Sequence, residues 1–312
     1  MRTRFEIVLA DDLEPALLRA AGEEALREIE RVESSLSVFR SDSDLYKINQ
    51  QAAHQPVKVD ARVFSFLQRA LELCEQTSGA FDLAAGALAQ CWNLSGMADG
   101  AEGRVPTPAE IDAAWARGDM RRNVQLIPET SEVCFLREGV RLDPGAIGKG
   151  YALERAAQLL REAGIRSALL HGGTSTVYGL GQPPNQAAWK VAVQHPRKPD
   201  ALIATAMLRD TSLSVSTTAG KSFMFNGLRY GHVIDPRTGL PVQENTLAAV
   251  IHPSALLSDA LSTAHLVSGL DGQQALTTCY PDASFLLGRE VVSNEITLSL
   301  AGTADGRTFI LL

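Results

Sequence analysis

A glycine-rich segment near the middle of the chain combines an aspartate, a lysine and a turn that leads into a helix. It reads Asp143-Pro144-Gly145-Ala146-Ile147-Gly148-Lys149-Gly150-Tyr151. Such a turn can direct backbone N–H groups and the positive end of the helix dipole at an anion such as a phosphate. It is not a Walker A motif, because Gly150 follows Lys149 where a serine or threonine would bind Mg²⁺. A phosphate site and a tight structural loop both fit this pattern.

Asp259 and Thr263 form a second group, on a helix expected to begin near Leu256. Their i, i+4 spacing places both side chains on one helix face, with Ser262 close by. Carboxylate and hydroxyl oxygens suit a hard cation such as Mg²⁺, which also takes backbone carbonyls, waters and substrate phosphates as ligands. The alternative is that Asp259 caps the first helical turn while Thr263 faces solvent.

His232 lies in a third group, the segment Tyr230–Gly239. A histidine near the end of a strand and before a turn can serve as a general base. A hydrogen-bonded strand histidine is the commoner case, and it is the default interpretation of the other histidines: His54, His171, His195, His252 and His265. A fourth segment, Gly79-Ala80-Phe81-Asp82, follows a helix; Phe81 fits a core position and Asp82 fits a cap for the next element.

The elements that must position these groups begin with a strand at Met1–Leu9 and a long amphipathic helix at Glu14–Leu36. Ser41–Asn49 is rich in turn-forming residues. Val63–Thr77 has the apolar spacing of a second amphipathic helix, and Lys149–Ala163 that of a third, which Gly164 ends. Further expectations are a surface excursion at Ser95–Pro108, a strand at Val133–Leu136 with Gly139–Leu142 as its return partner, and a buried strand at Ala168–Leu170.

The second half of the chain is predicted to consist mostly of strands, at Lys190–Val193, Leu202–Leu208, Phe223–Phe225, Leu228–Ile234 and Leu247–Ile251. Asn226-Gly227 supplies the positive φ values of a two-residue type I′ hairpin turn. A turn is expected at Thr238-Gly239, and a helix at Leu256–Val267 that ends at Gly269, with short strands after it. Because helices and hairpins alternate without regular βαβ units, the pattern favours the α+β class.

The composition of the 312 residues is that of an ordinary soluble globular protein, with 45% hydrophobic and 21% charged residues. A net charge of −7 lacks the electrostatic footprint of a general nucleic-acid binder. The four cysteines are far apart and are expected to be unpaired thiols. No apolar run has the length of a signal peptide or a membrane span, so we expect a cytoplasmic protein, or an exported one whose leader has been removed.

Taken in order, these segments resemble the ApbE-type FAD:protein FMN transferases. The similarity begins at Leu36–Phe39, Ser41–Ser43 and Ile48-Asn49, and it continues through Gly79–Asp82, Asp143–Tyr151, Leu169–Gly173, Ser216–Thr218, His232–Gly239 and Asp259–Thr263. The segments Asp143–Gly150 and His232–Gly239 are the most specific. The resemblance implies an α+β fold of mixed, largely antiparallel sheets packed with helices, an ApbE-like and T-fold-related architecture.

The resemblance also assigns roles to individual residues. FAD contacts are implied for these residues: Met1, Phe39, Ala80, Phe81, Asp82, Asp143, Lys149 and Ile234. Mg²⁺ would be held by the backbone carbonyl of Ala146 and by the side chains of Asp259 and Thr263. His232 would be the base that takes the proton of the acceptor hydroxyl. Ser262 stands where some members of the family carry a second acidic ligand.

The implied reaction is Mg²⁺-dependent transfer of FMN from FAD to a threonine or serine hydroxyl of an acceptor protein, with formation of a phosphoester and release of AMP. Two alternatives remain at this point: an Mg²⁺-dependent FAD pyrophosphatase that yields FMN and AMP, and a non-catalytic FAD-binding carrier. We expect residues 1–312 to form a single domain or, alternatively, two lobes with the FAD and Mg²⁺ site in the cleft between them. FAD and the acceptor protein are the expected partners, without nucleic acid.

Overall fold

The computed structural model describes residues 3–93, 101–220, 222–291, 295–302 and 309–312. The chain divides into two compact units, each built from segments that are distant in the sequence. Unit 1 comprises residues 1–33, 147–216 and 246–312, and unit 2 comprises residues 34–146 and 217–245. Both units combine helices with antiparallel strand pairs, which confirms the α+β class.

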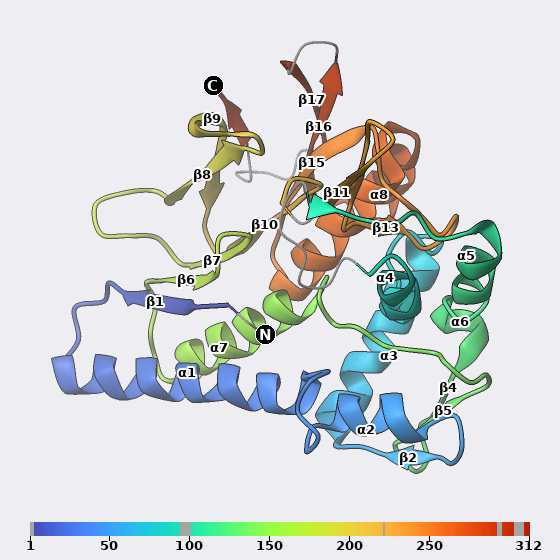
Figure 1. The fold of residues 1–312 in the computed structure, drawn as a ribbon. Helices are drawn as coiled ribbons and strands as arrows, with labels where there is room; N and C mark the ends of the chain where they lie inside the picture. Colours follow the sequence, from blue (N-terminus) through green and yellow to red (C-terminus); the bar gives the residue numbers. More distant parts are fainter. Residues whose placement is uncertain (1–2, 94–100, 221, 292–294, 303–308) are drawn as a thin grey trace. The chain divides into compact units, whose positions relative to one another are not determined.

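A seven-stranded sheet lies at the centre of unit 1, with the strand order β1-β6-β7-β10-β15-β16-β17 (Figure 1). Its strands are β1 (Phe5–Leu9), β6 (Ala168–Gly172), β7 (Thr176–Leu180), β10 (Thr211–Thr217), β15 (Asn245–His252), β16 (Ser284–Val291) and β17 (Glu295–Ala301). The neighbours β1 and β6, β6 and β7, β7 and β10, and β16 and β17 pair in antiparallel fashion. Every residue of β15 is buried, as expected of an inner strand covered on both faces.

Besides this sheet, unit 1 contains helices α7 (Gly148–Glu162) and α8 (Ala255–Cys279) and most of α1 (Pro15–Leu36). Helix α7 packs against α8 and against β6 and β7. The apolar face predicted for α7 is fully buried, at Leu153, Ala156, Ala157 and Leu160. The sequence placed the first and third amphipathic helices within one residue of their observed ends because their periodicity is strong.

Helix α8 is interrupted at Gly269. The backbone there has φ 61° and ψ −152°, a conformation available essentially to glycine alone. The first helical segment ends at this kink, and a second one follows it and continues to Cys279. A hydrogen bond of 3.3 Å between His265 Nε2 and Gln273 Oε1 spans the kink. The prediction of a helix end at Gly269 is therefore confirmed, whereas the second helical segment, which reaches Cys279, was not predicted.

A smaller sheet in unit 1 has the order β18-β9-β8. It contains β8 (Trp189–His195), β9 (Lys198–Leu208) and β18 (Phe309–Leu311), all paired antiparallel. Its apolar side chains share one buried cluster with those of the large sheet, including Val193, Ala206, Leu213 and Leu286.

Unit 2 is built from short elements around α3 (Ala61–Gln76). The other helices are α2 (Asp44–Gln51), the 3₁₀ turn η1 (Leu83–Ala85), α4 (Gly86–Cys91), α5 (Pro108–Trp115) and α6 (Met120–Asn123). The strands are β2 (Val57–Lys58), β3 (Ala101–Glu102), β4 (Val124–Ile127), β5 (Glu132–Phe135), β11 (Ser222–Phe225), β12 (Leu228–Gly231), β13 (Ile234–Asp235) and β14 (Leu240–Pro241). They form three small sheets: β2-β5-β4, β12-β11-β3 and β13-β14.

The hairpin predicted at Asn226-Gly227 is confirmed. Phe225 pairs with Leu228 across the turn, and both turn residues have positive φ, 49° at Asn226 and 78° at Gly227. The expected continuation of its second strand to Ile234 was wrong. Strand β12 ends at Gly231, and Ile234 begins a separate strand that pairs with β14.

Two further predictions in unit 2 were wrong. The segment Ser41–Asn49 was interpreted as turns, but it contains helix α2, whose N-cap is Ser43; the serine side chain accepts the N–H of Tyr46. Gly139–Leu142 was expected to pair with the strand at Val133, whereas β5 pairs with β4 and β2. Backbone groups of Leu142 instead bond the side chain of Asn49, the Leu142 N–H at 2.8 Å and the Leu142 carbonyl at 2.9 Å.

The surface excursion expected at Ser95–Pro108 lies partly outside the described residues, which resume at Ala101. Among the helices that the structure does describe, none combines the length and the apolar character needed to cross a bilayer.

Candidate functional site

Asp259 lies at the centre of the candidate site residues in unit 1. Its side chain is buried, and its Oδ2 accepts the backbone N–H of Gly150 at 2.9 Å. Its Oδ1 accepts the hydroxyl of Thr176 at 3.2 Å and lies 3.6 Å from the ammonium nitrogen of Lys149. The carboxylate therefore joins the start of α7 to α8 and places a negative charge beside the glycine-rich turn.

Gly150 allows this close packing of the two helices. A Cβ at this position would lie 2.1 Å from the carbonyl oxygen of Ala255 and 2.7 Å from the Cβ of Asp259. Both distances are far below van der Waals contact, so any side chain would push α7 away from α8. The glycine thus serves the helix contact, and its N–H serves the carboxylate of Asp259.

The N-terminus of α8 is fixed by Glu154, which lies one helical turn after Gly150 on α7. The Glu154 carboxylate accepts the Ser254 hydroxyl, together with the backbone N–H of Leu256 at 3.2 Å. Ser254 is also the N-cap of α8 and accepts the N–H of Leu257 at 3.2 Å. A carboxylate at a helix N-terminus is favourable for the helix dipole, so Glu154 stabilises the turn that precedes Asp259.

Thr263 lies one turn beyond Asp259 and is half-buried. Its hydroxyl is 3.1 Å from the hydroxyl of Ser216 on β10, which in turn is 2.8 Å from the hydroxyl of Ser262. The predicted i, i+4 arrangement of Asp259 and Thr263 on one helix is thus present, and a serine from the sheet supports it.

These groups have the donor chemistry of a site for a hard cation. The carboxylate of Asp259 and the hydroxyl of Thr263 are oxygen ligands of the kind Mg²⁺ accepts. A buried carboxylate is costly without a positive charge nearby, and Lys149 is the cation that approaches it here. The residues of unit 1 therefore fit a magnesium ion.

In unit 2, Asp143 shapes the glycine-rich turn that contains Ala146. The Asp143 N–H donates to the carbonyl of Leu83 at 2.8 Å, and its Oδ1 accepts the N–H of Gly145 at 2.8 Å. The Asp143 side chain is exposed and Ala146 is half-buried. Asp143 thus serves the structural loop that the sequence offered as an alternative, while its carboxylate remains accessible to solvent.

The segment from Ala80 to Asp82 is buried. Ala80 and Phe81 are at most 1% exposed, backbone included, which agrees with the core position predicted for Phe81. The Phe81 N–H donates to the hydroxyl of Thr77 at 3.1 Å. Phe39 has the opposite character: 69% of its surface is exposed, which leaves its ring accessible to a ligand.

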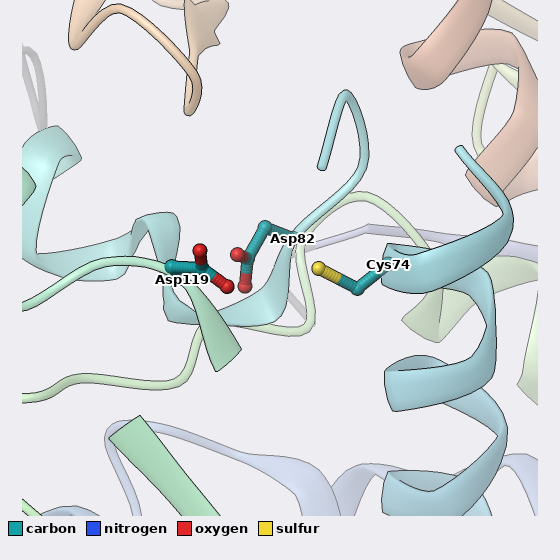
Figure 2. A group of neighbouring side chains, drawn as sticks. All are labelled: Cys74, Asp82 and Asp119. Carbon is teal, nitrogen blue, oxygen red and sulfur yellow. The ribbon is translucent and has the colours of Figure 1, made fainter. Parts of the chain in front are cut away.

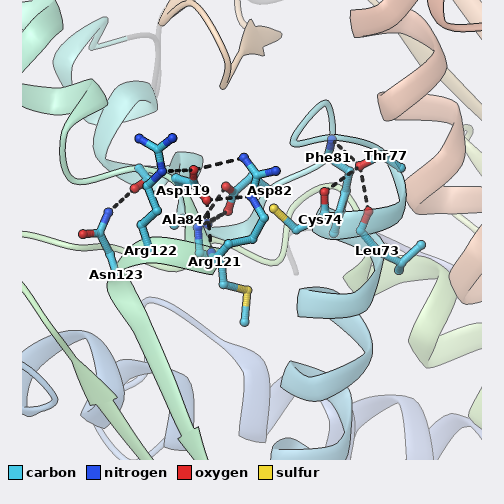
Figure 3. A network of polar contacts seen from close by, with 12 residues as sticks. Leu73, Cys74, Thr77, Phe81, Asp82, Ala84, Asp119, Arg121, Arg122 and Asn123 are labelled. Carbon is cyan, nitrogen blue, oxygen red and sulfur yellow. Dashed lines mark hydrogen bonds and ion pairs between the residues drawn. The ribbon is translucent and has the colours of Figure 1, made fainter.

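Asp82 belongs to a polar network with Cys74 and Asp119, drawn in Figures 2 and 3. The Asp82 carboxylate accepts the N–H of Ala84 at 2.7 Å and that of Met120 at 3.0 Å. Burial raises the pKa of Asp82, and the two backbone donors oppose that shift. The predicted capping role of Asp82 is confirmed, because it is the N-cap of η1.

The ligand atoms of Cys74, Asp82 and Asp119 all lie within 4.8 Å of one another, a spacing that a metal site would also have. The positive charge at this place comes from arginine, however. Arg121 donates twice to the Asp119 carboxylate, at 2.8 and 3.0 Å (Figure 3). Burial raises the pKa of the Cys74 thiol, which favours its protonated form. The cluster fits a structural network better than a metal centre.

A pocket of about 530 Å³ lies beside this network, within unit 2. Trp115 lines this pocket together with four arginines: Arg121, Arg122, Arg137 and Arg237. Asp119 pairs with two of them, at 2.8 and 3.2 Å, and Asp235 pairs with Arg237 at 2.8 Å. The arginines outnumber the carboxylates around the pocket, so a ligand with negative charge is favoured there.

His232 lies between β12 and β13 and is exposed. The turn that follows is closed by the Gly239 N–H, which donates to the carbonyl of Asp235 at 2.8 Å. Two indoles anchor the turn: Trp115 donates to the carbonyl of Arg237 at 3.1 Å, and Trp92 donates to that of Gly239 at 2.8 Å. The segment after His232 is therefore held firmly, while the imidazole faces outward.

Ile234 is buried in an aromatic cluster with Trp92, Phe223 and Tyr230. The ring of Tyr230 stacks on Phe223 at 5.2 Å and on Trp92 at 5.5 Å between centroids. The side chain of Ile234 thus forms part of the core under the segment that carries His232.

The predicted site residues fall into two groups. The structure brings Lys149, Asp259 and Thr263 together in unit 1. The remaining described residues belong to unit 2: Phe39, Ala80, Phe81, Asp82, Asp143, Ala146, His232 and Ile234. Met1 lies outside the described residues.

Three residues with clear roles around Asp259 and Thr263 were missed as site residues: Glu154, Thr176 and Ser216. Glu154 had a usable signal, because it follows Gly150 by four residues on the same helix face. Thr176 and Ser216 lie on strands distant in sequence from α8, so no local pattern could connect them to it.

Comparison with known proteins relates both units to one family. The sequence model of the ApbE family matches residues 1–286. The chain is 34% identical over 290 residues to the FAD:protein FMN transferase of Treponema pallidum, covering 87% of this chain and 78% of that protein. It is 30% identical over 263 residues to the FAD:protein FMN transferase of Salmonella typhimurium, covering 82% and 73% of the two chains.

A solved structure extends the similarity to the fold. The ApbE protein of Thermotoga maritima superposes with a TM-score of 0.83 at 29% sequence identity. The alignment covers 95% of this chain and 94% of that one.

Proposed function

Because the chain belongs to the ApbE family, we propose that it transfers FMN from FAD to a threonine or serine hydroxyl of an acceptor protein. The proposed reaction depends on Mg²⁺, forms a phosphoester and releases AMP. Relatives at 30% and 34% identity that carry the name FAD:protein FMN transferase support the flavin transfer. The dependence on Mg²⁺, the threonine or serine target and the release of AMP are further parts of our proposal, beyond the flavin transfer that the names of these relatives describe.

The observation that carries the proposal is the environment of Asp259. A carboxylate is buried at a helix contact that only glycine permits, beside a lysine and one turn from a hydroxyl. Replacement of a buried ion pair by apolar side chains is often neutral or stabilising, so stability alone does not account for the charged groups at this place. Retention of charged and hydroxyl groups here is what binding of a cation and a phosphate requires.

Asp259 and Thr263 would hold Mg²⁺ through their side chains, and Ala146 through its backbone carbonyl. The bound ion would neutralise charge on the pyrophosphate of FAD as the bond to AMP breaks. Lys149 would contribute positive charge to the same pyrophosphate. Phosphoryl-type transfer needs mainly positioning and charge neutralisation from a protein, which these groups can supply.

FAD would contact Asp143, Lys149, Phe39 and the segment Ala80–Asp82, with Ile234 supporting the flavin and Met1 at its edge. The arginine-lined pocket beside Asp82 supports an anionic ligand in this region of unit 2. The exposed ring of Phe39 offers an apolar surface on which a planar ring can pack.

His232 would accept the proton of the acceptor hydroxyl while the hydroxyl oxygen bonds to the phosphorus of the FMN moiety. The bond between that phosphorus and the oxygen of AMP then breaks. An exposed imidazole on an anchored turn suits this task, because a protein substrate must approach from solvent. A neutral histidine near pH 7 can accept such a proton.

The test is to incubate the protein with FAD, Mg²⁺ and an acceptor that carries a flavinylation-site threonine, and to measure intact mass. The acceptor should gain one FMN with the wild-type protein and none with His232→Ala. His54→Ala is a matched control, because His54 is also an exposed histidine of unit 2 and has no proposed role.

Full transfer by His232→Ala would refute the base assignment. Release of AMP and free FMN, without labelling of any acceptor, would instead favour the pyrophosphatase, in which water replaces the hydroxyl. Tight FAD binding without turnover, with or without Mg²⁺, would select the non-catalytic carrier.

A further inference from the structure

Three hydroxyl groups and one carbonyl form a continuous hydrogen-bonded chain in unit 1. The hydroxyl of Thr263 is 3.1 Å from that of Ser216, and the hydroxyl of Ser216 is 2.8 Å from that of Ser262. The hydroxyl of Ser262 is 2.9 Å from the backbone carbonyl of Asp259. This series of hydrogen bonds thus starts and ends at residues of the proposed cation site and passes through Ser216, a serine of the sheet.

Only one arrangement of the three hydroxyl protons satisfies all three contacts. A carbonyl oxygen can only accept, so Ser262 must donate its single proton to Asp259. Ser262 can then only accept from Ser216, which leaves Ser216 only able to accept from Thr263. The proton of Thr263 is therefore directed at Ser216, and its oxygen lone pairs point elsewhere.

We propose that Ser216 is a positioning residue that sets the orientation of the Thr263 hydroxyl, so that its lone pairs face a bound divalent cation. This inference rests on the proposed magnesium site and assigns a new role within it. A hydroxyl whose proton pointed at the cation would repel it, whereas one whose proton is held by Ser216 presents only lone pairs.

A second group could accept the hydroxyl proton of Thr263 in place of Ser216. A threonine in a helix can donate its proton to the carbonyl four residues earlier, which for Thr263 is the carbonyl of Asp259. In the structure that carbonyl already accepts from Ser262. Ser216 and Ser262 together therefore keep Thr263 from this alternative, and Ser262 does so without being a ligand.

The experiment measures Mn²⁺ or Mg²⁺ affinity directly, by electron paramagnetic resonance or calorimetry, with the protein alone and with saturating FAD. Ser216→Ala should weaken cation binding by about 10–100-fold, the usual effect of removing a group that orients a ligand. Ser216→Thr keeps the hydroxyl and should restore binding. Ser216→Cys keeps the volume with a poor acceptor and should also bind weakly.

Ser214→Ala is the matched control. Ser214 lies two residues earlier on β10 and is buried, whereas Ser216 is half-buried; the hydroxyl of Ser214 bonds Ser258 at 2.8 Å. The Ser214→Ala variant should bind the cation as tightly as the wild-type protein does. Circular dichroism and denaturant unfolding of each variant show whether a loss of affinity comes from unfolding.

The outcomes separate this inference from the proposal beneath it. If Asp259→Asn binds the cation as tightly as the wild-type protein, the proposed magnesium site is wrong and the role of Ser216 falls with it. If Asp259→Asn loses affinity but folded Ser216→Ala and Ser216→Cys keep it, the site stands and the positioning role is refuted. An equal loss in Ser214→Ala would refute it too.

Discussion

The substitution Gly150→Ala tests the packing that positions Asp259. Alanine normally favours a helix over glycine, by up to about 1 kcal/mol. Here the added Cβ would lie 2.1 Å from the carbonyl oxygen of Ala255, which is backbone and cannot rotate away. Overpacking of this kind costs about 1–3 kcal/mol. Because the helix preference of alanine offsets part of this cost, we expect Gly150→Ala to lower the free energy of unfolding by about 1–2 kcal/mol.

The measurement is denaturant unfolding of the full chain, with Gly22→Ala as the control of opposite sign. Gly22 lies inside helix α1, and a Cβ there would meet only Leu9 Cδ1 at 3.4 Å, which is ordinary contact. Gly22→Ala should raise the free energy of unfolding by about 0.5–1 kcal/mol. A Gly150→Ala protein as stable as the wild type would show that α7 and α8 are not constrained as the structure indicates.

Gly150→Ala should also weaken cation binding, since the Gly150 N–H that holds Asp259 moves with the helix. This loss should appear in a Mn²⁺ titration under conditions where the variant remains folded. Unchanged affinity in a destabilised variant would show that the helix contact serves stability alone.

Three further predictions concern unit 1. Asp259→Asn should weaken cation binding by at least about 10-fold in the same titration and reduce FMN transfer, and unaltered transfer would argue against the proposed ligand. Burial lowers the pKa of His265 from 6.5 to about 4, so the stability it confers is complete above pH 6.5 and is lost as the pH falls toward 4. The loss should be about 3 kcal/mol in denaturant unfolding at a series of pH values, and it should disappear in His265→Phe. Ser254→Ala removes the N-cap of α8 and should cost about 1 kcal/mol in the same assay, whereas no loss would mean that Glu154 alone suffices.

Those parts of the fold that depend on local signals could be predicted from the sequence. The helices at Pro15–Leu36 and Gly148–Glu162 follow from apolar periodicity, and the hairpin at Asn226-Gly227 follows from turn chemistry. Helix α2 was missed because its sequence is short and polar, and its stability depends on the Ser43 cap and on burial of Leu45 and Ile48 against the rest of unit 2.

The candidate site was predictable only in part, for a related reason. The i, i+4 pair Asp259 and Thr263 is local, and its placement on one helix could be read directly. The contact of Gly150 with Ala255 and the bond between Glu154 and Ser254 each join residues at least a hundred positions apart. Such contacts depend on how helices pack, and no sequence window contains both partners.

The interleaving of the two units has a consequence for synthesis on the ribosome. Lys149 and Gly150 are made more than a hundred residues before Asp259, and the seven-stranded sheet receives β15, β16 and β17 only after unit 2 has been translated. Until then, β10 lacks its second neighbour, β15, and the first turn of α7 lacks its carboxylate partner, Asp259. Long-range pairing of this kind is slow and leaves an unpaired strand edge exposed in the nascent chain. A chain released before residue 255 would carry the glycine-rich turn but could not complete the cation site.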